Sequence, residues 1–469
     1  MRVRFALFAA VLFVTCLIAG CVVLAAPAVI QEKSAVPSAP ANAKNGIGVS
    51  VIYTAAKQYL PLSWLHGGER FPQGATLMIH DSNGDRVLSD KFVASADANV
   101  SFDGKSAIFS GRQHPGDAWQ AWRLTLSDGT LTQLTKGNED IIRPMFLPMN
   151  RIVYARKSRN RFVLETLSLS DGKAEPLSYA PGSYLPTDVL RDGRILFSSS
   201  YPLGTDGAPE IYAVYSDGTG VESYRCDHGA ARYSGHELSS GDILFPGGKG
   251  LARFTSPRAQ QVAFASPAGD YAGDVVEATP HTLLVAWRPS SKQPYQIQLL
   301  NTADNQARAF LSQAGTNLLN PVMVAPREIP NRHPSTLRDW TAANLLALDS
   351  YTSKYAFVPG SIAKARVYTV DNAGRRKLLG TSPVEKDGSF YVHVPGDAPL
   401  QIELTDSNGK VLKKEAGWFW TRKSEQRICV GCHAGPEHAP ENAVPAVLLR
   451  TTTPVDMTAT QAAGSKGAK

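Results

Sequence analysis

The sequence repeats a short β-strand pattern about every 45 residues, and this period constrains the fold more than any other feature. Between about Gly74 and Ala325, apolar strand segments end in an aromatic residue, and these residues lie 45, 43, 48 and 42 positions apart: Phe109, Tyr154, Phe197, Phe245 and Trp287. Turn glycines form a second series, spaced 45, 43 and 46 residues apart: Gly84, Gly129, Gly172 and Gly218. Two series with one period indicate a four-stranded unit repeated along the chain, which predicts a β-propeller.

Weaker hairpin turns near Ser256 and Asp304 bring the number of units to six, although five or seven blades also fit the pattern. We therefore predict an all-β chain with a six-bladed propeller of the TolB/WD40-like kind over residues 56–328. Apolar residues make up 43% of the chain and charged residues 19%, which excludes a mainly disordered or collagen-like protein.

A second domain follows a Pro- and Arg-rich joint at 327–334. Three segments there alternate apolar and polar residues, at 365–370, 389–394 and 400–404, and turns such as Lys386-Asp387-Gly388 separate them. This pattern predicts a small antiparallel β-sandwich over residues 335–425.

The strongest chemical motif is Cys429-Val430-Gly431-Cys432-His433, the attachment pattern of c-type haem. Two thiols at this spacing can form thioethers along one porphyrin edge, and the following histidine can bind the iron as proximal ligand. Structural zinc would need four ligands, a thioredoxin-like redox pair would need a βαβ unit, and a disulfide between the two cysteines would close a small strained ring. We predict one covalent haem c on a binding segment at 426–452.

The sequence does not assign the ligand on the distal side of the iron. His438, Met457, His393 and His333 are candidates for a second axial ligand, and none is preferred. The aromatic run at 418–420 could pack against the porphyrin or belong to the sandwich core.

A second cluster combines metal-ligand residue types between two predicted blades: Cys226, Asp227, His228, His236 and Glu237. These residues could bind a transition metal. The favoured interpretation is a buried cysteine beside histidines that make ordinary loop hydrogen bonds.

The N-terminus carries an export signal. Arg2 and Arg4 precede an apolar stretch at 5–19, and Leu17-Ile18-Ala19-Gly20-Cys21 resembles a bacterial lipobox. We predict a signal peptide at 1–20, a lipid anchor on Cys21 that attaches the protein to the membrane, and a flexible tether at 21–55. Cleavage after residue 28, or an uncut anchor over 5–30, are the alternatives. The protein is thus expected in the periplasm or on the envelope, and residues 453–469 are expected to be a disordered tail.

Several functional classes lack support. The net charge of +7 comes largely from the termini, so nucleic-acid binding is not expected. The sequence contains no Gly-x-Ser-x-Gly elbow, no Walker loop and no Gly-x-Gly-x-x-Gly unit. Only one apolar run in the sequence approaches the length of a membrane span, which excludes a polytopic membrane protein.

Two resemblances add to these inferences. The phrases at 101–104 and 127–135 resemble the TolB-type propeller repeat, and the segments at 345–351, 383–392 and 427–433 resemble the hydrazine synthase alpha subunit family. That resemblance, over about residues 60–450, implies a propeller, a middle domain with a catalytic haem, and a C-terminal domain with a second, bis-histidine haem. On this basis Cys429 and Cys432 correspond to the thioether sites, and His433 to the proximal ligand, of the last haem.

The departures from the family matter for activity. The sequence has one Cys-x-x-Cys-His motif, which implies that the catalytic haem is missing, and it ends 36 residues after His433, too soon for the family's downstream distal histidine. Hydrazine synthesis is therefore not expected. The leading hypothesis is an exported monohaem cytochrome that transfers electrons, with the propeller as docking platform for a redox partner protein. The alternatives are a haem-dependent oxidoreductase with a small substrate and a non-catalytic propeller binding protein, so whether the chain is an enzyme stays open.

Overall fold

The computed structural model describes residues 47–200, 208–224, 231–257, 259–335, 337–353, 355–371, 374–415, 417–431 and 438–458. The predicted signal peptide, Cys21 and the predicted tail beyond 458 lie outside these residues. Helices in the described part are limited to the 3-10 helix η1 (Ser63–His66) and the short α1 (Ala446–Arg450), which confirms the all-β prediction. Neither helix, nor any other stretch of the described chain, is long and apolar enough to cross a membrane as a helix.

Strands β1 to β25 of the described residues form six antiparallel sheets. The first contains β25 (Asn317–Met323), β1 (Val51–Ala56), β2 (Thr76–Asp81) and β3 (Gly84–Val87), and the second β4 (Ala94–Val100), β5 (Ser106–Arg112), β6 (Gln120–Thr125) and β7 (Leu131–Gln133). The third contains β8 (Ile141–Leu147), β9 (Arg151–Ser158), β10 (Arg161–Ser168) and β11 (Ala174–Pro176), and the fourth β12 (Tyr184–Val189), β13 (Arg194–Ser199), β14 (Glu210–Tyr215) and β15 (Glu222–Ser223). The fifth contains β16 (His236–Glu237), β17 (Ile243–Pro246), β18 (Leu251–Phe254) and β19 (Val262–Phe264). The sixth contains β20 (Asp270–Tyr271), β21 (Val276–Thr279), β22 (Thr282–Arg288), β23 (Gln296–Asn301) and β24 (Ala307–Leu311).

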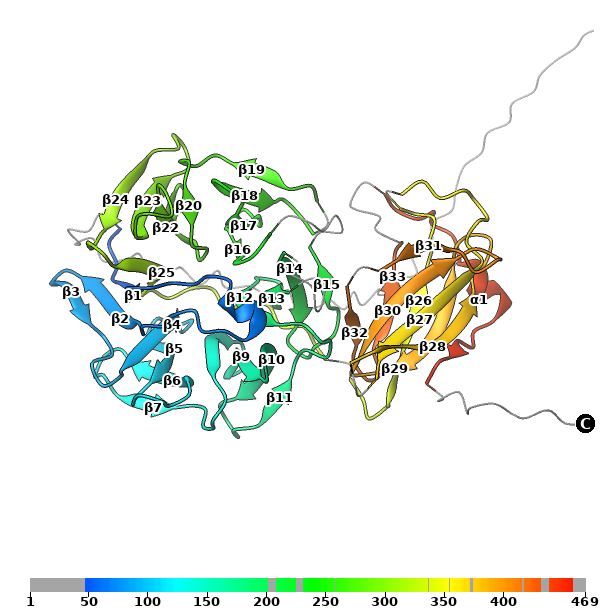
Figure 1. Cartoon of the computed structure of the whole chain (residues 1–469), viewed down its shortest axis with the longest axis horizontal. Coiled ribbons are helices and arrows are strands. Elements are labelled where there is room, and N and C mark those ends of the chain that lie inside the picture. The colour runs from blue at the N-terminus through cyan, green and yellow to red at the C-terminus, as the bar shows by residue number, and fades with distance from the viewer. Residues whose placement is uncertain are drawn as a thin grey trace, which may run out of the picture. The chain divides into compact units, whose positions relative to one another are not determined.

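These sheets are arranged around a common centre as in a propeller (Figure 1). Strands β4, β12, β16 and β25 lie nearest the centre, and β3, β7, β11, β15, β19 and β24 form the rim. Burial follows this order: every residue of the inner strand β8 is buried, whereas every residue of the rim strand β11 is exposed.

The repeat expected from the sequence is confirmed by this topology. The aromatic residues of the first series lie on the second strand of their sheets, and Phe109, Tyr154, Phe197 and Phe245 are at most 3% exposed. Three of the turn glycines lie between the third and fourth strands and Gly84 begins the fourth strand of its sheet, all with φ from +73° to +93°. Glycine adopts this backbone conformation without the steric cost that other residues meet. The turn that needs it recurs once in each of these sheets, so the glycines and the sheets have the same period.

The first sheet joins the two ends of the propeller, because β25 pairs with β1. Asn317 Nδ2 adds hydrogen bonds to the carbonyl oxygens of Ala56 and Lys57, both at 3.1 Å. Residues 51–55, expected in the tether, are therefore a propeller strand, and Val51 and Ile52 are fully buried. This strand begins before the predicted boundary at 56, and the partner that completes it lies far along the chain.

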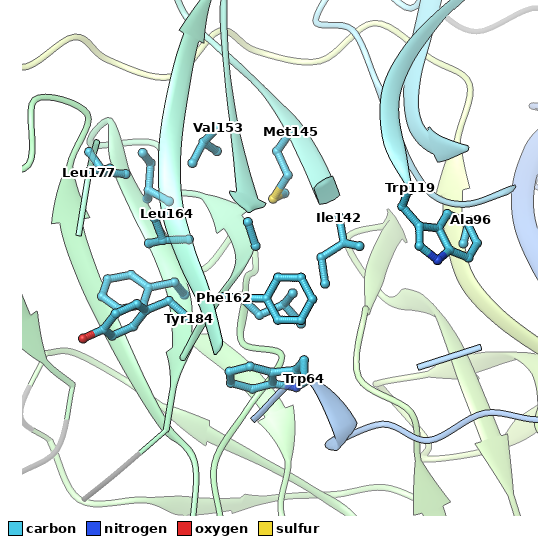
Figure 2. Close-up of a cluster of buried hydrophobic side chains, with 14 of the residues drawn as sticks. Trp64, Ala96, Trp119, Ile142, Met145, Val153, Phe162, Leu164, Leu177 and Tyr184 are labelled. Atoms are coloured by element: carbon cyan, nitrogen blue, oxygen red, sulfur yellow. The ribbon is translucent and has the colours of Figure 1, made fainter. Parts of the chain in front are cut away.

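A large cluster of buried side chains packs between the sheets around β8 to β12 (Figure 2). Trp64, on η1, lies below Phe162 and Ile142 and is 1% exposed. Ser183 Oγ fixes η1 by donating a hydrogen bond of 2.6 Å to the Trp64 carbonyl oxygen. Burying a side chain of this kind stabilises the fold by about 1.5–3 kcal/mol.

The second region contains two sheets that share one apolar core. One sheet contains β33 (Gln426–Cys429), β26 (Ala342–Ala347), β29 (Phe390–Pro395) and β34 (Val455–Asp456). The other contains β28 (Arg376–Pro383), β27 (Lys364–Val370), β30 (Ala398–Thr405), β31 (Val411–Lys414) and β32 (Phe419–Thr421). Leu345 and Phe390 from the first sheet and Val367 and Leu404 from the second are all buried in this core.

This sandwich differs from the sequence prediction in two respects. It is not wholly antiparallel, since β26 pairs with β33 and β29 with β34 in parallel. It also extends beyond residue 425: β33 begins the predicted haem segment, and Met457 in the predicted tail is 1% exposed within the core. Both differences arise because the final strands return to the sandwich from distant parts of the chain.

Candidate functional site

Cys429 is the last residue of the edge strand β33. It lies opposite Ala347 of β26, and its carbonyl oxygen accepts a hydrogen bond of 2.9 Å from the Leu348 backbone nitrogen. Cys432 and His433 lie outside the described residues, so the structure places the first of the three predicted haem residues.

Gly431 passes unusually close to a neighbouring turn. A Cβ atom at this position would lie 2.2 Å from the Thr352 carbonyl oxygen. The Asp349 carboxylate holds this turn by accepting hydrogen bonds of 2.7 Å from the Tyr351 backbone nitrogen and from Thr352 Oγ1. The glycine of the motif is therefore required by packing, a role that the sequence pattern alone did not indicate.

The Cys429 side chain lines a cavity of about 330 Å³. Its walls come from the open edge of the sandwich and from the fourth propeller sheet: Tyr212, Val221, Glu222, Ser223, Ala347, Ser350, Phe390, Ile402, Leu404, Lys413, Glu415, Gly417, Trp418, Phe419, Arg427, Ile428, Val430 and Gly431. The cavity is predominantly apolar and aromatic. It is large enough to hold part of an organic ligand.

One buried polar atom in this cavity has no hydrogen-bond partner. Ser350 is fully buried, lines the cavity and makes no hydrogen bond through Oγ within the described part of the chain. An orphaned hydroxyl costs free energy unless another group satisfies it. The cavity therefore offers a polar contact to a bound molecule.

Arg427 fixes the edge strand against the propeller. Its guanidinium donates a short hydrogen bond to the Val221 carbonyl oxygen, pairs with Glu425 at 3.5 Å and lies over the Phe419 ring at 5.5 Å. Burial raises the pKa of the Cys429 thiol, and the nearby Arg427 opposes this effect without cancelling it. The free thiol is thus protonated at neutral pH.

The three aromatic residues at 418–420 were expected either to pack against the porphyrin or to belong to the sandwich core, and they do not share one environment. Trp418 and Phe419 line the cavity beside Cys429. Trp420 is 1% exposed in the propeller core, where Nε1 donates a hydrogen bond of 2.9 Å to the Gly218 carbonyl oxygen. Its ring also packs edge-on against Tyr184, with ring centroids 6.0 Å apart.

The four candidates for a distal iron ligand do not line the cavity. His393 Nδ1 is 2.6 Å from Asn344 Oδ1, and His333 stacks on Tyr215 with ring centroids 3.8 Å apart. Met457 is buried in the sandwich core, and His438 is not among the lining residues. The described lining residues thus include neither histidine nor methionine.

The second cluster is described only in part, since Cys226, Asp227 and His228 lie outside the described residues. His236 Nε2 is 2.8 Å from Asp274 Oδ1, and Glu237 accepts a hydrogen bond of 2.7 Å from the Arg191 backbone nitrogen. Across the described ranges, no three His, Cys, Asp or Glu side chains are grouped so that they could hold a metal ion.

Comparison with known proteins gives a family match in the second region. Residues 350–434 match the family model described as the hydrazine synthase alpha subunit middle domain. The hydrazine synthase alpha subunit of Kuenenia stuttgartiensis is 33% identical over 61 residues, which is 13% of this chain and 8% of that protein. The matched part is thus a small fraction of the curated relative, but the family resemblance seen in the sequence is confirmed.

A solved structure extends the likeness in fold over most of the chain. Kuenenia stuttgartiensis hydrazine synthase aligns over 86% of this chain and 71% of that chain, with a TM-score of 0.72 and 16% identity. TolB from Acinetobacter baumannii aligns over 60% of this chain and 67% of that chain, with a TM-score of 0.46 and 15% identity.

The family match also corrects one detail. Its residues 350–434 include Cys429, Cys432 and His433 and belong to the middle domain of the family. The assignment of this motif to the last haem of the family, made from the sequence, is therefore wrong.

Proposed function

Because the chain is hydrazine synthase alpha-like, we propose that it is an exported monohaem c-type protein. One haem is bound covalently through Cys429 and Cys432, and His433 is its proximal iron ligand. The lipobox at Cys21 anchors the protein to the envelope membrane, and the six antiparallel sheets are six propeller blades.

The observation that carries this proposal is the cavity beside Cys429. The Cys429 thiol, two aromatic side chains and an unsatisfied buried hydroxyl line one cavity, which is a suitable set of groups for a large, mostly apolar ligand with polar edges. The donor set therefore fits a covalently attached porphyrin.

A bound c-type haem would supply one-electron redox chemistry at its iron. Trp418 and Phe419 line the cavity and would shield a bound group from water, which would strengthen electrostatic interactions inside it. Gly431 allows the segment between the two cysteines to pass Thr352, and Arg427 holds the edge strand against the propeller.

Two functions are compatible with such a haem. The first is electron transfer, with the propeller as docking platform for a redox partner protein. The second is a haem-dependent oxidoreductase that acts on a small substrate. The middle-domain match favours the second, because the family resemblance implies a catalytic haem in that domain. We propose accordingly that the motif corresponds to the middle-domain haem. Hydrazine synthesis itself is not proposed, since the sequence has one haem motif.

The test is the visible spectrum of the reduced protein, expressed with a periplasmic c-haem maturation system, with and without carbon monoxide. A covalent c-type band that shifts with the gas supports the oxidoreductase, and a band that does not shift supports electron transfer. In Cys429→Ser we expect the loss of one thioether, visible in the pyridine haemochrome, whereas the control Cys226→Ser retains both. Absence of covalent haem in the wild-type protein would refute the proposal.

A further inference from the structure

The propeller contains a second cavity, separate from the one at Cys429. It has a volume of about 480 Å³ and is lined by residues of the inner strands β4, β8, β12, β16, β21 and β25 and of the segment 325–330. None of its lining residues belongs to the cavity beside Cys429. It therefore needs an explanation of its own.

Four polar residues reach this cavity from equivalent positions in their sheets. Asp97 and Arg143 are 46 residues apart, and Asp274 and Asn320 are also 46 residues apart, in step with the sheet repeat. All four have a positive φ, between +35° and +61°. Such conformations are unfavourable for most residues, and here they turn polar side chains toward the centre of the propeller.

Two of these side chains satisfy each other. The Arg143 guanidinium donates two hydrogen bonds to the Asp274 carboxylate, at 2.5 and 2.8 Å, and His236 Nε2 lies 2.8 Å from the same carboxylate. The Asp274 carboxylate therefore already has hydrogen-bond partners and needs none from a ligand.

The other two side chains each leave an acceptor unsatisfied. Asp97 is 3% exposed; Oδ2 accepts hydrogen bonds from Arg70 and Ser110, but Oδ1 accepts none, and Arg143 Nη1 is 3.9 Å away from it. Asn320 is 5% exposed, and its Oδ1 also has no donor. Two buried acceptors without donors indicate that a hydrogen-bond donor is missing from the cavity.

The charge of the lining indicates which donor fits. Six carboxylates line the cavity against three guanidinium groups: Asp97, Asp188, Glu237, Asp274, Glu277 and Glu328, with Arg143, Arg191 and Arg327. A cation is therefore favoured over a neutral donor. The described residues contain no group of three or more His, Cys, Asp or Glu able to hold a metal ion, which favours an organic cation.

We propose that this cavity binds a small primary amine. Its ammonium group donates hydrogen bonds to Asp97 Oδ1 and Asn320 Oδ1, and its hydrocarbon part packs against the apolar side chains of the wall, which are those of Val100, Met145, Val189, Leu238, Val276 and Val322. An ammonium group offers three N–H donors, so it can satisfy both acceptors at once.

Isothermal titration calorimetry of the full-length protein with n-butylammonium, n-butanol and Ca²⁺ tests this proposal. The amine should bind, and butanol, which has the same shape without the charge, should bind at least tenfold more weakly. Equal binding of butanol and butylammonium, absence of amine binding, or binding of Ca²⁺ in place of the amine would each overturn the proposal.

Substitutions at Asn320 locate the site. Asn320→Gly removes the acceptor but tolerates the φ of +49°, and it should weaken amine binding about tenfold. Asn320→Asp adds a negative charge and should strengthen binding by a similar factor. Asn305→Gly, at an exposed residue with a φ of +59°, is the matched control and should leave the affinity unchanged. Unchanged affinity in both Asn320 variants would refute the site.

Discussion

Replacing Asp274 by asparagine should destabilise the propeller by about 3–5 kcal/mol, because it removes the hydrogen-bonded counter-charge of the buried Arg143 guanidinium, which keeps only the Asp97 carboxylate at 3.9 Å. The side chains of Arg143 and Asp274 are 9% and 10% exposed, and two hydrogen bonds join them. Asparagine keeps the volume and accepts the φ of +35°. The substitution therefore removes the charge with little other change.

The pH dependence of stability should change as well. Burial would raise the pKa of Asp274, but Arg143 and His236 outweigh this effect and hold the pKa well below its usual range. A folded pKa below the unfolded value of about 3.9 stabilises the protein above that pH, and this contribution is lost as the pH falls toward the folded pKa. The wild-type protein should therefore lose stability below pH ~4, and Asp274→Asn should lose less.

Urea unfolding followed by tryptophan fluorescence, at pH 7 and at pH 3, measures both effects. The matched control is Asp371→Asn, since Asp371 pairs at 2.9 Å with Arg375, whose side chain is 80% exposed. An exposed pair contributes about 0–1 kcal/mol. The reasoning is refuted if Asp274→Asn destabilises the protein no more than Asp371→Asn does.

Three further predictions concern the second region. Gly431→Ala should abolish most haem loading, measured by pyridine haemochrome per protein, because its Cβ would lie 2.2 Å from the Thr352 carbonyl oxygen. In the haem-free protein, Cys429 should react with iodoacetamide more slowly than an unstructured cysteine at pH 8, because burial raises its pKa; peptide mass spectrometry measures the rate. Trp420→Phe, which loses the hydrogen bond to Gly218, should cost about 1 kcal/mol in urea unfolding, and Trp420→Ala about 3–5 kcal/mol.

Each of these predictions has its own control. Gly250→Ala, where the nearest atom to a new Cβ is the rotatable Ser266 Oγ at 3.3 Å, should load haem normally. Unfolding in urea should bring the alkylation rate of Cys429 to that of a free thiol. Equal stability losses for the two Trp420 variants would show that ring packing contributes nothing there.

The propeller could be predicted from the sequence because its signals are local and repeated. The second-strand aromatic residues occupy the same position in five sheets, and the turn glycines the same turn in four, so each unit supports the same interpretation. Strand β1 was missed because it is completed by β25, and the burial of Val51 depends on a partner that no local pattern near residue 51 reveals.

The candidate site was predictable only in part for the same reason. The cysteine motif is contiguous and carries its own spacing, so it could be recognised directly. The cavity around Cys429 is built from segments near Tyr212, Ser350 and Trp418, which come together through tertiary packing. Likewise, Met457 was expected in a tail because its partner strand β29 lies some sixty residues earlier.

The pairing of β1 with β25 also sets the order in which the molecule can be completed. Asn317, which bonds to the Ala56 carbonyl oxygen, is 261 residues away from it in sequence. At a synthesis rate of about 5–20 residues per second, β1 waits about 15–50 s for its neighbour. During that interval a mostly apolar strand has an unpaired edge, which is prone to aggregation. If the chain is exported, as we propose, this closure has to wait until translocation is over, because only an unclosed ring can still be threaded.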